Sequence, residues 1–451
     1  MNRRTLLMAA AAPLAGPALL RPALAQPAPV PPPPILFIHG NGDHSALWIT
    51  TLWRFESNGF NRDAMATLDL EHPLARDDDG VAQPLRSSST DFLQATARAI
   101  VSLRRRTGAA RVALVGNSRG GYPIRNHVLH NNGAGEVSHA VLCGTPNHGV
   151  WDSADWRPNS EFNARSAFLR KLNGGTTDVA EGTAFLTLRS DGNDLYAQPD
   201  GRYIGRPGIP TDVDAAGPEL RGATNLVLPG VDHRETAYSP RAFREIHRFV
   251  TGAEPLRLDI VPEGRPVLNG RVTGTPGGVP TNKPLAGAIV EVHRVDAAGL
   301  RMGPPILKRQ TRGDGVWGPV TVGPDWHLEF MVSAADHPTT HFYRQPFPRS
   351  SNLVHLRPAR PLAGADLEAA GVVLFTRPRA YFGVPRDVVL LDGHEPDAAQ
   401  VPRGVPASAT VTARLGPARL NTSIAGLFNL QRLVGRVWPV AEGHVAVLEL
   451  S

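Results

Sequence analysis

One short segment carries residue types that could form a nucleophile. Residues 116–120 read Gly-Asn-Ser-Arg-Gly, follow the apolar run 112–115 and precede a helical pattern. In such a strand–turn–helix context, a Gly-x-Ser-x-Gly motif holds its serine hydroxyl above the edge of a sheet. Gly116 and Gly120 flank the turn because a Cβ at either position would clash with the neighbouring strand or helix. We therefore predict that Ser118 attacks a carbonyl carbon, near the positive end of the following helix.

A serine nucleophile needs a base, and the base needs a carboxylate to orient it. Among 16 histidines, His233 follows the apolar run 226–228 and precedes a helical pattern. This places it at the carboxyl edge of the predicted sheet, where ligands bind in open α/β folds, and we predict it as the general base. Asp191 and Asp194 both lie in the exit loop of the strand candidate 185–188. Either carboxylate could reach the histidine.

The negative charge that develops on the attacked oxygen needs two backbone N–H donors. The residue after the nucleophile supplies one, which here is Arg119. The second donor usually follows the first strand, and the loop 39–42 comes directly after the apolar run 35–38. Asn41 is the predicted second donor. His39 is expected to brace this loop and to take no part in proton transfer.

The elements that must position these groups follow an α/β pattern. Short runs of consecutive apolar residues are typical of strands buried on both faces of a parallel sheet. The runs cover 35–38, 112–115, 140–143 and 226–228, and helical stripes between and after them cover 91–106 and 239–250. Strands that alternate with helices predict a mostly parallel, doubly wound sheet.

The loops 37–42, 116–120 and 144–149, together with the acid and His233 loops, resemble the secreted bacterial lipase/esterase branch of the α/β-hydrolase superfamily. The resemblance covers 35–252 and implies hydrolysis of carboxylic esters through an acyl-enzyme intermediate.

The same resemblance extends to the surroundings of the nucleophile. The segment 194–199 is similar to the acid loop of lipases, which favours Asp194 over Asp191. By the same likeness, Asn147 and His148 line the substrate pocket; their alternative roles are a turn residue and a polar cap. The segment 150–184 is expected to form a lid or pocket wall.

After residue 252 the pattern becomes alternating, with frequent Gly- and Pro-rich turns, as in β-sandwiches. Residues 256–358 resemble the transthyretin-like, carboxypeptidase-regulatory-like modules of secreted enzymes. We therefore expect an α/β-hydrolase domain followed by one or two β-sandwich domains. The predicted boundaries are a catalytic domain at 35–252, a transthyretin-like β-sandwich at 253–358 and a second small β domain at 359–451.

The N-terminal residues 1–25 have the pattern of an export signal: Arg3-Arg4, a modest apolar stretch and small residues before a cleavage site. The arginine pair favours the twin-arginine route, with an ordinary Sec signal as the alternative. Prolines and a glycine interrupt the apolar stretch, so we expect no stable membrane anchor. Residues 26–34 include six prolines and predict a stiff spacer. The expected location is the periplasm or the extracellular space.

Composition narrows the classes of partner. The formal net charge is +6, but about half of it lies in the predicted signal, and no basic run exceeds 104–106, so we expect no nucleic-acid partner. The single cysteine, Cys143, excludes a disulfide within the chain and any cysteine metal cluster. The acidic run 77–79 is interpreted as a solvated loop. No metal or cofactor is expected, and oligomeric state is not predicted.

The expected partner is an ester or lipid substrate, and two other functions stay open. The β modules could dock the enzyme on an insoluble extracellular polyester, which would make it a depolymerase. Alternatively, the protein could bind a ligand without catalysis on a hydrolase scaffold. The complete set of nucleophile, base and oxyanion loops argues against this second alternative.

Overall fold

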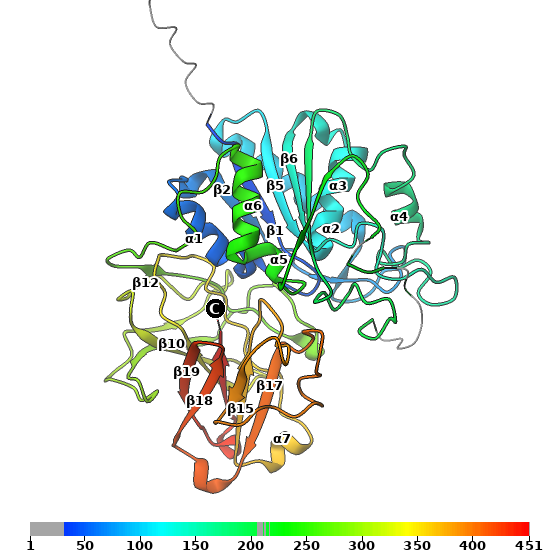
Figure 1. Ribbon diagram of the computed structural model, residues 1–451. Helices are drawn as coiled ribbons and strands as arrows, with labels where there is room; N and C mark the ends of the chain where they lie inside the picture. The colour runs from blue at the N-terminus through cyan, green and yellow to red at the C-terminus, as the bar shows by residue number, and fades with distance from the viewer. Residues whose placement is uncertain (1–30, 205–210, 212, 216, 451) are drawn as a thin grey trace, which may run out of the picture. The chain divides into compact units, whose positions relative to one another are not determined.

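A six-stranded parallel sheet organises the first half of the chain in the computed structural model (Figure 1). Its spatial order is β2-β1-β5-β6-β7-β8, and every neighbouring pair is parallel. The strands are β1 (Ile35–Ile38), β2 (Met65–Leu68), β5 (Val112–Asn117), β6 (Val137–Cys143), β7 (Ala184–Ser190) and β8 (Thr224–Leu228). Two interior strands, β1 and β5, are buried throughout. The predicted mostly parallel sheet is confirmed.

The structure describes residues 31–204, 211, 213–215 and 217–450. Residues 33–451 form one compact unit by their internal contacts. The predicted export signal 1–25 and residues 26–30 of the predicted spacer lie outside the described residues. Within the part of the chain that is described, no helix is long and apolar enough to cross a membrane.

Helices cover both faces of this sheet because alternate residues of each strand point to opposite sides. Phe37 belongs to the core shared with α1 (Ile49–Ser57) and α6 (Pro240–Thr251). Leu36, its neighbour, belongs to the core shared with α2 (Ser89–Thr107) and α3 (Gly121–His130). The shorter helices of this half are α4 (Ala167–Leu172) and α5 (Glu235–Tyr238).

Local signals set the ends of the longest helices. Ser88 and Asp91 form a capping box at the start of α2, and Gly108 ends that helix with φ 70°. Pro240 occupies the first turn of α6, and Gly252 ends it with φ 74°.

The second half of the chain contains a seven-stranded mixed sheet with the order β11-β10-β13-β14-β20-β15-β17. Its strands are β10 (Ile289–Val295), β11 (Leu307–Gln310), β13 (His327–Ser333), β14 (Thr339–Arg344), β15 (Gly371–Thr376), β17 (Thr410–Leu415) and β20 (His444–Glu449). The last strand, β20, is parallel to both of its neighbours, β14 and β15. The sheet therefore crosses the boundary that the sequence places between 358 and 359.

Smaller elements complete the β half. A three-stranded antiparallel sheet has the order β16-β18-β19, and two pairs of short strands lie elsewhere in the chain. These strands are β16 (Val389–Leu391), β18 (Ser423–Phe428) and β19 (Gln431–Arg436), with β9 (Val267–Leu268) paired to β12 (Val320–Thr321). The other short pair, β3 (Leu74–Ala75) and β4 (Arg86–Ser87), belongs to the first half of the chain. A short helix, α7 (Ala365–Glu368), also lies in the β half.

The two halves share one hydrophobic core cluster, which includes side chains from α1, α6 and the seven-stranded sheet. Trp53 of α1 is 4% exposed, packs edge-on against Phe347 and donates through Nε1 to the Ser350 carbonyl at 2.8 Å. The Asn282 amide donates to the carbonyls of Asp43 and Leu70, both at 2.9 Å. The β half is thus packed against loops at the carboxyl edge of the parallel sheet.

Candidate active site

The turn that carries Ser118 has the strained geometry expected of a nucleophile elbow. Ser118 has φ 52°, directly after β5 and before α3. A Cβ on Gly116 would lie 2.6 Å from the Gly120 carbonyl oxygen. A Cβ on Gly120 would lie 2.6 Å from the carbonyl oxygens of Ile38 and His39. Neither position tolerates a side chain without a shift of backbone, so the two glycines permit the sharp turn.

A histidine and a carboxylate lie next to this turn. The Nδ1 atom of His233 is 2.8 Å from Oδ2 of Asp194, and His233 is only 2% exposed. Because a carboxylate accepts hydrogen bonds, this contact places the imidazole proton on Nδ1 and leaves Nε2 as a proton acceptor. The Nε2 atom is buried and has no hydrogen-bond partner. His233 and Ser118 line the same cavity.

Of the two acids that the sequence leaves open, the structure brings Asp194 to the histidine. The other oxygen of Asp194 accepts the Tyr196 N–H at 2.8 Å, which fixes the carboxylate. Asp191 instead accepts N–H groups from Gly230 at 2.8 Å and from Asn193 at 3.1 Å. Burial tends to raise the pKa of Asp191, but these hydrogen bonds outweigh it and lower the pKa. Asp191 therefore ties together the two loops that carry Asp194 and His233.

The residues predicted to supply oxyanion donors are held by their side chains. Asn41 lines the cavity, and its side-chain oxygen accepts the Ala75 N–H at 2.8 Å. The fully buried Arg119 side chain pairs with Glu161 and donates to Oγ of Ser87 at 2.9 Å and to the Pro73 carbonyl at 3.1 Å. These bonds anchor the position of the residue that follows Ser118.

No motif or pattern in the sequence points to Glu161 as a residue of the site. It lies in the long connection between β6 and β7, outside any motif, and is 1% exposed. Burial raises the pKa of Glu161, and this effect outweighs that of the Arg119 guanidinium, which acts to lower the pKa. Its contact with Arg119 joins the expected lid or wall segment 150–184 to the nucleophile turn.

His39 braces the first loop, as the sequence predicts for it. Its Nε2 accepts the Leu70 N–H at 3.0 Å, and its Nδ1 lies 2.7 Å from the Gly40 carbonyl oxygen. Burial lowers the pKa of His39, so the ring stays neutral in this place.

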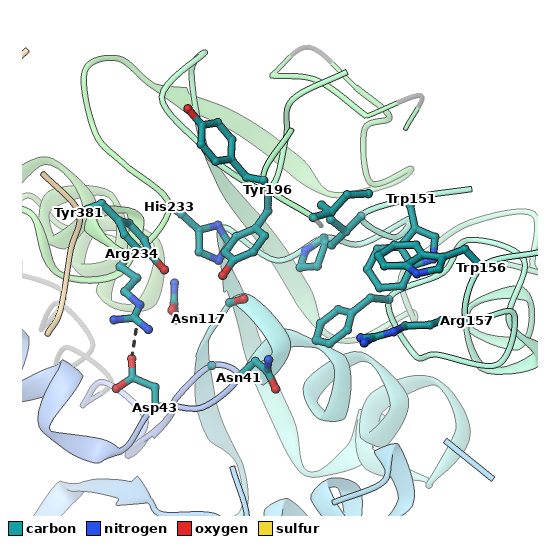
Figure 2. Close-up of a pocket in the computed structure, with 17 residues that line it drawn as sticks. Asn41, Asp43, Asn117, Trp151, Trp156, Arg157, Tyr196, His233, Arg234 and Tyr381 are labelled. Atoms are coloured by element: carbon teal, nitrogen blue, oxygen red, sulfur yellow. Dashed lines mark ion pairs between the residues drawn. The ribbon is translucent and has the colours of Figure 1, made fainter. Parts of the chain in front are cut away.

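The cavity above Ser118 has a volume of about 200 Å³ and two chemically different sides (Figure 2). On one side of His233 lie Trp151 and Trp156, whose rings are 4.6 Å apart, with Arg157. On the other side lie Asp43, Arg234 and Tyr381. The full lining is Gly40, Asn41, Asp43, Asn117, Ser118, Pro146, Val150, Trp151, Trp156, Arg157, Phe162, Tyr196, Tyr203, Ile204, His233, Arg234 and Tyr381. The aromatic side suits an apolar group, and the other side suits a polar one.

The resemblance misplaces two of the predicted pocket residues. Asn147 and His148 do not line the cavity above Ser118; they line a separate cavity of about 50 Å³, and Pro146 of the same loop faces the catalytic cavity. His148 Nε2 lies 3.5 Å from Asp178, and the Asn147 carbonyl accepts from Arg125 at 2.9 Å. Each residue therefore makes one contact with a buried neighbour behind the loop, His148 with Asp178 and the Asn147 backbone with Arg125.

Tyr381 shows that the β half completes the cavity above Ser118. The Arg234 guanidinium lies 5.2 Å from the centre of the Tyr381 ring, and Arg234 Nε is 3.9 Å from Oδ2 of Asp43. Tyr196 adds an edge-on ring 4.6 Å from the His233 ring. Since Tyr381 lies 148 residues beyond the histidine, no local pattern in the sequence points to it.

The β half also holds the loop that carries His233. The buried Asp232 carboxylate accepts the N–H groups of Arg234 and Glu235, both at 2.9 Å, and the N–H of Tyr381 at 2.8 Å. Two of these bonds stay within the histidine loop and the third crosses to the β half. Asp232 thus fixes the histidine loop against the cavity wall.

Two arginines of the β half reinforce this contact. Glu235 pairs with Arg377 at 2.8 Å and with Arg386 at 3.0 Å. Burial of Glu235 tends to raise its pKa, but the two guanidinium groups outweigh it and lower the pKa. The residues on either side of His233 are therefore both bonded to the β half.

No group of three or more His, Cys, Asp or Glu side chains within the described residues could hold a metal ion. The acidic run 77–79, interpreted from sequence as a solvated loop, has separate protein partners. Asp77 pairs with Arg157 at 2.8 Å, Asp78 accepts from Asn159 at 2.8 Å, and Asp79 accepts the Ser89 N–H at 2.6 Å. Its carboxylates do not converge on one point.

Comparisons with known proteins place a lipase-related family on part of the β half. Residues 265–361 match the family model described as lipase C-terminal domain. The match lies on the region expected to be transthyretin-like and gives it a different description, so that detail of the resemblance is not supported. A comparison with curated protein sequences finds no match.

Several solved structures are similar at low identity. Bacillus licheniformis lipase BlEst2 in its mature form is 21% identical, over 50% of this chain and 95% of that chain, with a TM-score of 0.36. The propeptide form of the same lipase is 15% identical, over 91% and 94%, with a TM-score of 0.37. Phospholipase PlaB from Legionella pneumophila is 12% identical, over 93% of each chain, with a TM-score of 0.32. These scores are low, so the assignment of function rests on the site itself.

Proposed function

We propose that the protein is an exported serine hydrolase that cleaves carboxylic esters through an acyl-enzyme intermediate. The observation that carries the proposal is the arrangement in one cavity: Ser118 on a strained turn, beside His233, whose Nδ1 is bonded to Asp194 and whose Nε2 is unpartnered. This is the set of groups that a hydroxyl nucleophile requires.

The reaction would proceed in two halves. The Ser118 hydroxyl transfers its proton to Nε2 of His233 as Oγ bonds to the ester carbonyl carbon. The Asn41 and Arg119 N–H groups stabilise the resulting oxyanion. The C–O bond to the alcohol breaks, and the alcohol leaves with the proton from His233. Water then loses a proton to His233, attacks the acyl carbon and releases the acid, while Ser118 recovers its proton.

The substrate is proposed to be an ester with one apolar and one polar part. The walls formed by Trp151, Trp156 and Phe162 offer apolar surface, whereas Asp43 and Arg234 offer hydrogen-bonding groups. The lipase C-terminal match on the β half supports a lipid-like ester. Export is proposed from the pattern of residues 1–25. N-terminal sequencing of the mature protein tests it, since an intact signal would contradict processing after Ala25.

No observation in the described part of the structure specifically favours either alternative function, the polyester depolymerase or the non-catalytic binding protein. Polymer docking by the β half would call for a surface remote from the chemistry, whereas the β half supplies Tyr381 to the cavity itself. A binding protein without catalysis would not need the unpartnered Nε2 of His233 beside a strained serine.

Substitution of the nucleophile tests the proposal. Ser118→Ala should lower kcat on nitrophenyl esters of short and long acyl chains by at least about 10³-fold without loss of folding. A fluorophosphonate probe should label the wild-type protein and not the variant. Ser102→Ala, on the exposed side of α2, is the matched control and should behave as wild type. Hydrolysis by Ser118→Ala near the wild-type rate, or a wild-type protein that the probe does not label, would contradict the proposal.

A further inference from the structure

A second cavity lies between the segment 43–49, which ends at the first residue of α1, and the seven-stranded sheet of the β half. Its volume is about 220 Å³, and neither Ser118 nor His233 lines it. Asp43 lines both this cavity and the catalytic one. The lining residues are Asp43, His44, Ala46, Ile49, Phe342, Arg344, His355, Arg357, Ala359, Leu374, Thr376, Pro378, Arg379, Thr410, Val447 and Glu449.

The charges around this cavity do not balance. Three arginines and two carboxylates line it, and both carboxylates already have arginine partners: Glu449 pairs with Arg344 at 2.7 Å, and Asp43 lies 3.9 Å from Arg234. Within the described part of the chain, no carboxylate lies at ion-pair distance from the other two arginines, Arg357 and Arg379. His355 also lines the cavity, and its Nε2 lies 3.1 Å from Oδ2 of Asp69.

The two unpaired guanidinium groups are held in place by neutral acceptors. Arg357 donates to the side-chain oxygen of Asn282 at 2.8 Å, and Arg379 donates to the Ala46 carbonyl at 3.1 Å. Arg379 is 9% exposed, and its Nε has no hydrogen-bond partner. Burial lowers the pKa of both arginines, although Asp43, together with Asp69 at Arg357 and Glu449 at Arg379, acts to raise it. A buried unpaired charge is costly, and an anion in the cavity would offset that cost.

The rest of the wall decides which kind of anion fits. Much of it is apolar and offers no hydrogen-bond donor: Ala46, Ile49, Phe342, Leu374 and Val447. Phosphate or sulfate spreads its charge over all its oxygens and would leave some of them against this apolar surface. A carboxylate has its charge at one end, in a planar form that matches guanidinium groups, and an apolar chain at the other.

We propose that this cavity binds a small aliphatic monocarboxylate, whose charged end neutralises Arg357 and Arg379 and whose short chain packs against Ile49, Phe342 and Val447. The site is distinct from the catalytic cavity and does not depend on the proposed hydrolase activity. Its occupation would stabilise the contact between the catalytic half and the β half, because both halves contribute to its wall.

Ligand-dependent thermal unfolding and calorimetric titration of the mature full-length protein test the proposal. Butyrate should bind saturably and raise Tm, whereas the neutral analogue butyramide and inorganic phosphate, at matched ionic strength, should not. Arg379→Met and Arg357→Met should each weaken butyrate binding at least tenfold. The ligand-free Tm of Arg379→Met should not fall, since the variant removes an unpaired buried charge. The control Arg360→Met removes an exposed arginine close in sequence and should bind butyrate as the wild type does.

Three results would overturn the proposal: no butyrate binding by the wild type, equal binding of phosphate, or undiminished butyrate binding by both arginine variants. The last result would mean that butyrate occupies another site, such as the catalytic cavity. If either variant fails to fold, wild-type crystals soaked in 2-bromobutyrate give an independent answer. The anomalous bromine signal should lie beside Phe342 and Ile49, and a signal confined to other places would contradict the site.

Discussion

The substitution Asp232→Asn can remove the hydrogen bond that joins the two halves while it keeps the hydrogen bonds within the histidine loop. Oδ1 of Asp232 accepts the N–H groups of Arg234 and Glu235, and an asparagine can keep both. Oδ2 accepts the Tyr381 N–H at 2.8 Å. In the variant an amide NH₂ would replace Oδ2 and meet that N–H as a second donor. The substitution therefore removes the contact to the β half with little change of shape.

The structure sets the size of the expected effect. A buried N–H that loses its acceptor costs about 1–3 kcal/mol. Oδ2 also lies 3.7 Å from Arg386 and 3.9 Å from Arg377, so the variant loses two charge interactions as well. If the cost appears as misplacement of His233, kcat/KM should fall roughly 5- to 150-fold, at about 1.4 kcal/mol for each factor of ten. Because His233 is the proposed general base of the chemical step, kcat should fall more than KM rises.

The assay compares kcat and KM on a soluble nitrophenyl ester, well below the measured Tm, so that unfolded protein does not contribute. Asp366→Asn is the control, since Asp366 pairs with Arg414 at 2.8 Å on the surface of the β half, away from the cavity lining. It should retain wild-type kinetics. A kcat of Asp232→Asn within about twofold of wild type, or an activity loss equal to its unfolded fraction, would show that this bond does not position His233.

Two further predictions concern individual carboxylates. Asp194→Asn should lower kcat by about 10³- to 10⁴-fold through loss of the oriented imidazole, whereas Asp191→Asn should mainly lower Tm; a larger kinetic loss in the second variant would reverse their roles. Glu329, fully buried, has its pKa lowered to about 2 by Arg301 and His341, although burial alone would raise it. Its folded pKa is below its unfolded value, so its stabilisation of about 3 kcal/mol should be present above pH ~4.5 and be lost as pH falls toward 2. Urea unfolding across this range should show a shallower acid slope for Glu329→Gln, and equal slopes would contradict the assignment.

The sequence predicts the parts of the site that depend on short-range pattern. The glycines of residues 116–120 and the apolar run before them indicate the nucleophile turn, because so sharp a turn leaves no room for a Cβ at either glycine. Candidate acids could be narrowed to Asp191 and Asp194 because both follow a strand. Position alone leaves both open, since two acids three residues apart in a loop can point in different directions. The likeness to the acid loop of lipases favours Asp194, and the structure brings that carboxylate to His233.

Other features depend on contacts between distant segments, which periodicity does not encode. The Asp232–Tyr381 bond joins residues 149 positions apart, and Glu161 reaches Arg119 from an irregular connection. Alternation of side chains predicts the strands of the β half. It does not predict that β20 lies between β14 and β15, because alternation sets which face of a strand is buried and leaves its neighbours open. Alternation therefore could not show that one sheet includes strands from both sides of the boundary predicted at 358/359.

The contacts of the β half bear on what that half contributes to activity. An appended module that only docks on a polymer would leave the histidine loop intact when removed. Here Asp232 and Glu235, on either side of His233, are both bonded to the β half, and Tyr381 forms part of the cavity wall. Hydrolysis of the smallest soluble ester would therefore depend on the β half as much as hydrolysis of an insoluble one, because both reactions need the same imidazole in the same place. On the proposed mechanism the two halves form one catalytic unit, in which the first half supplies the reacting groups and the second half fixes their geometry.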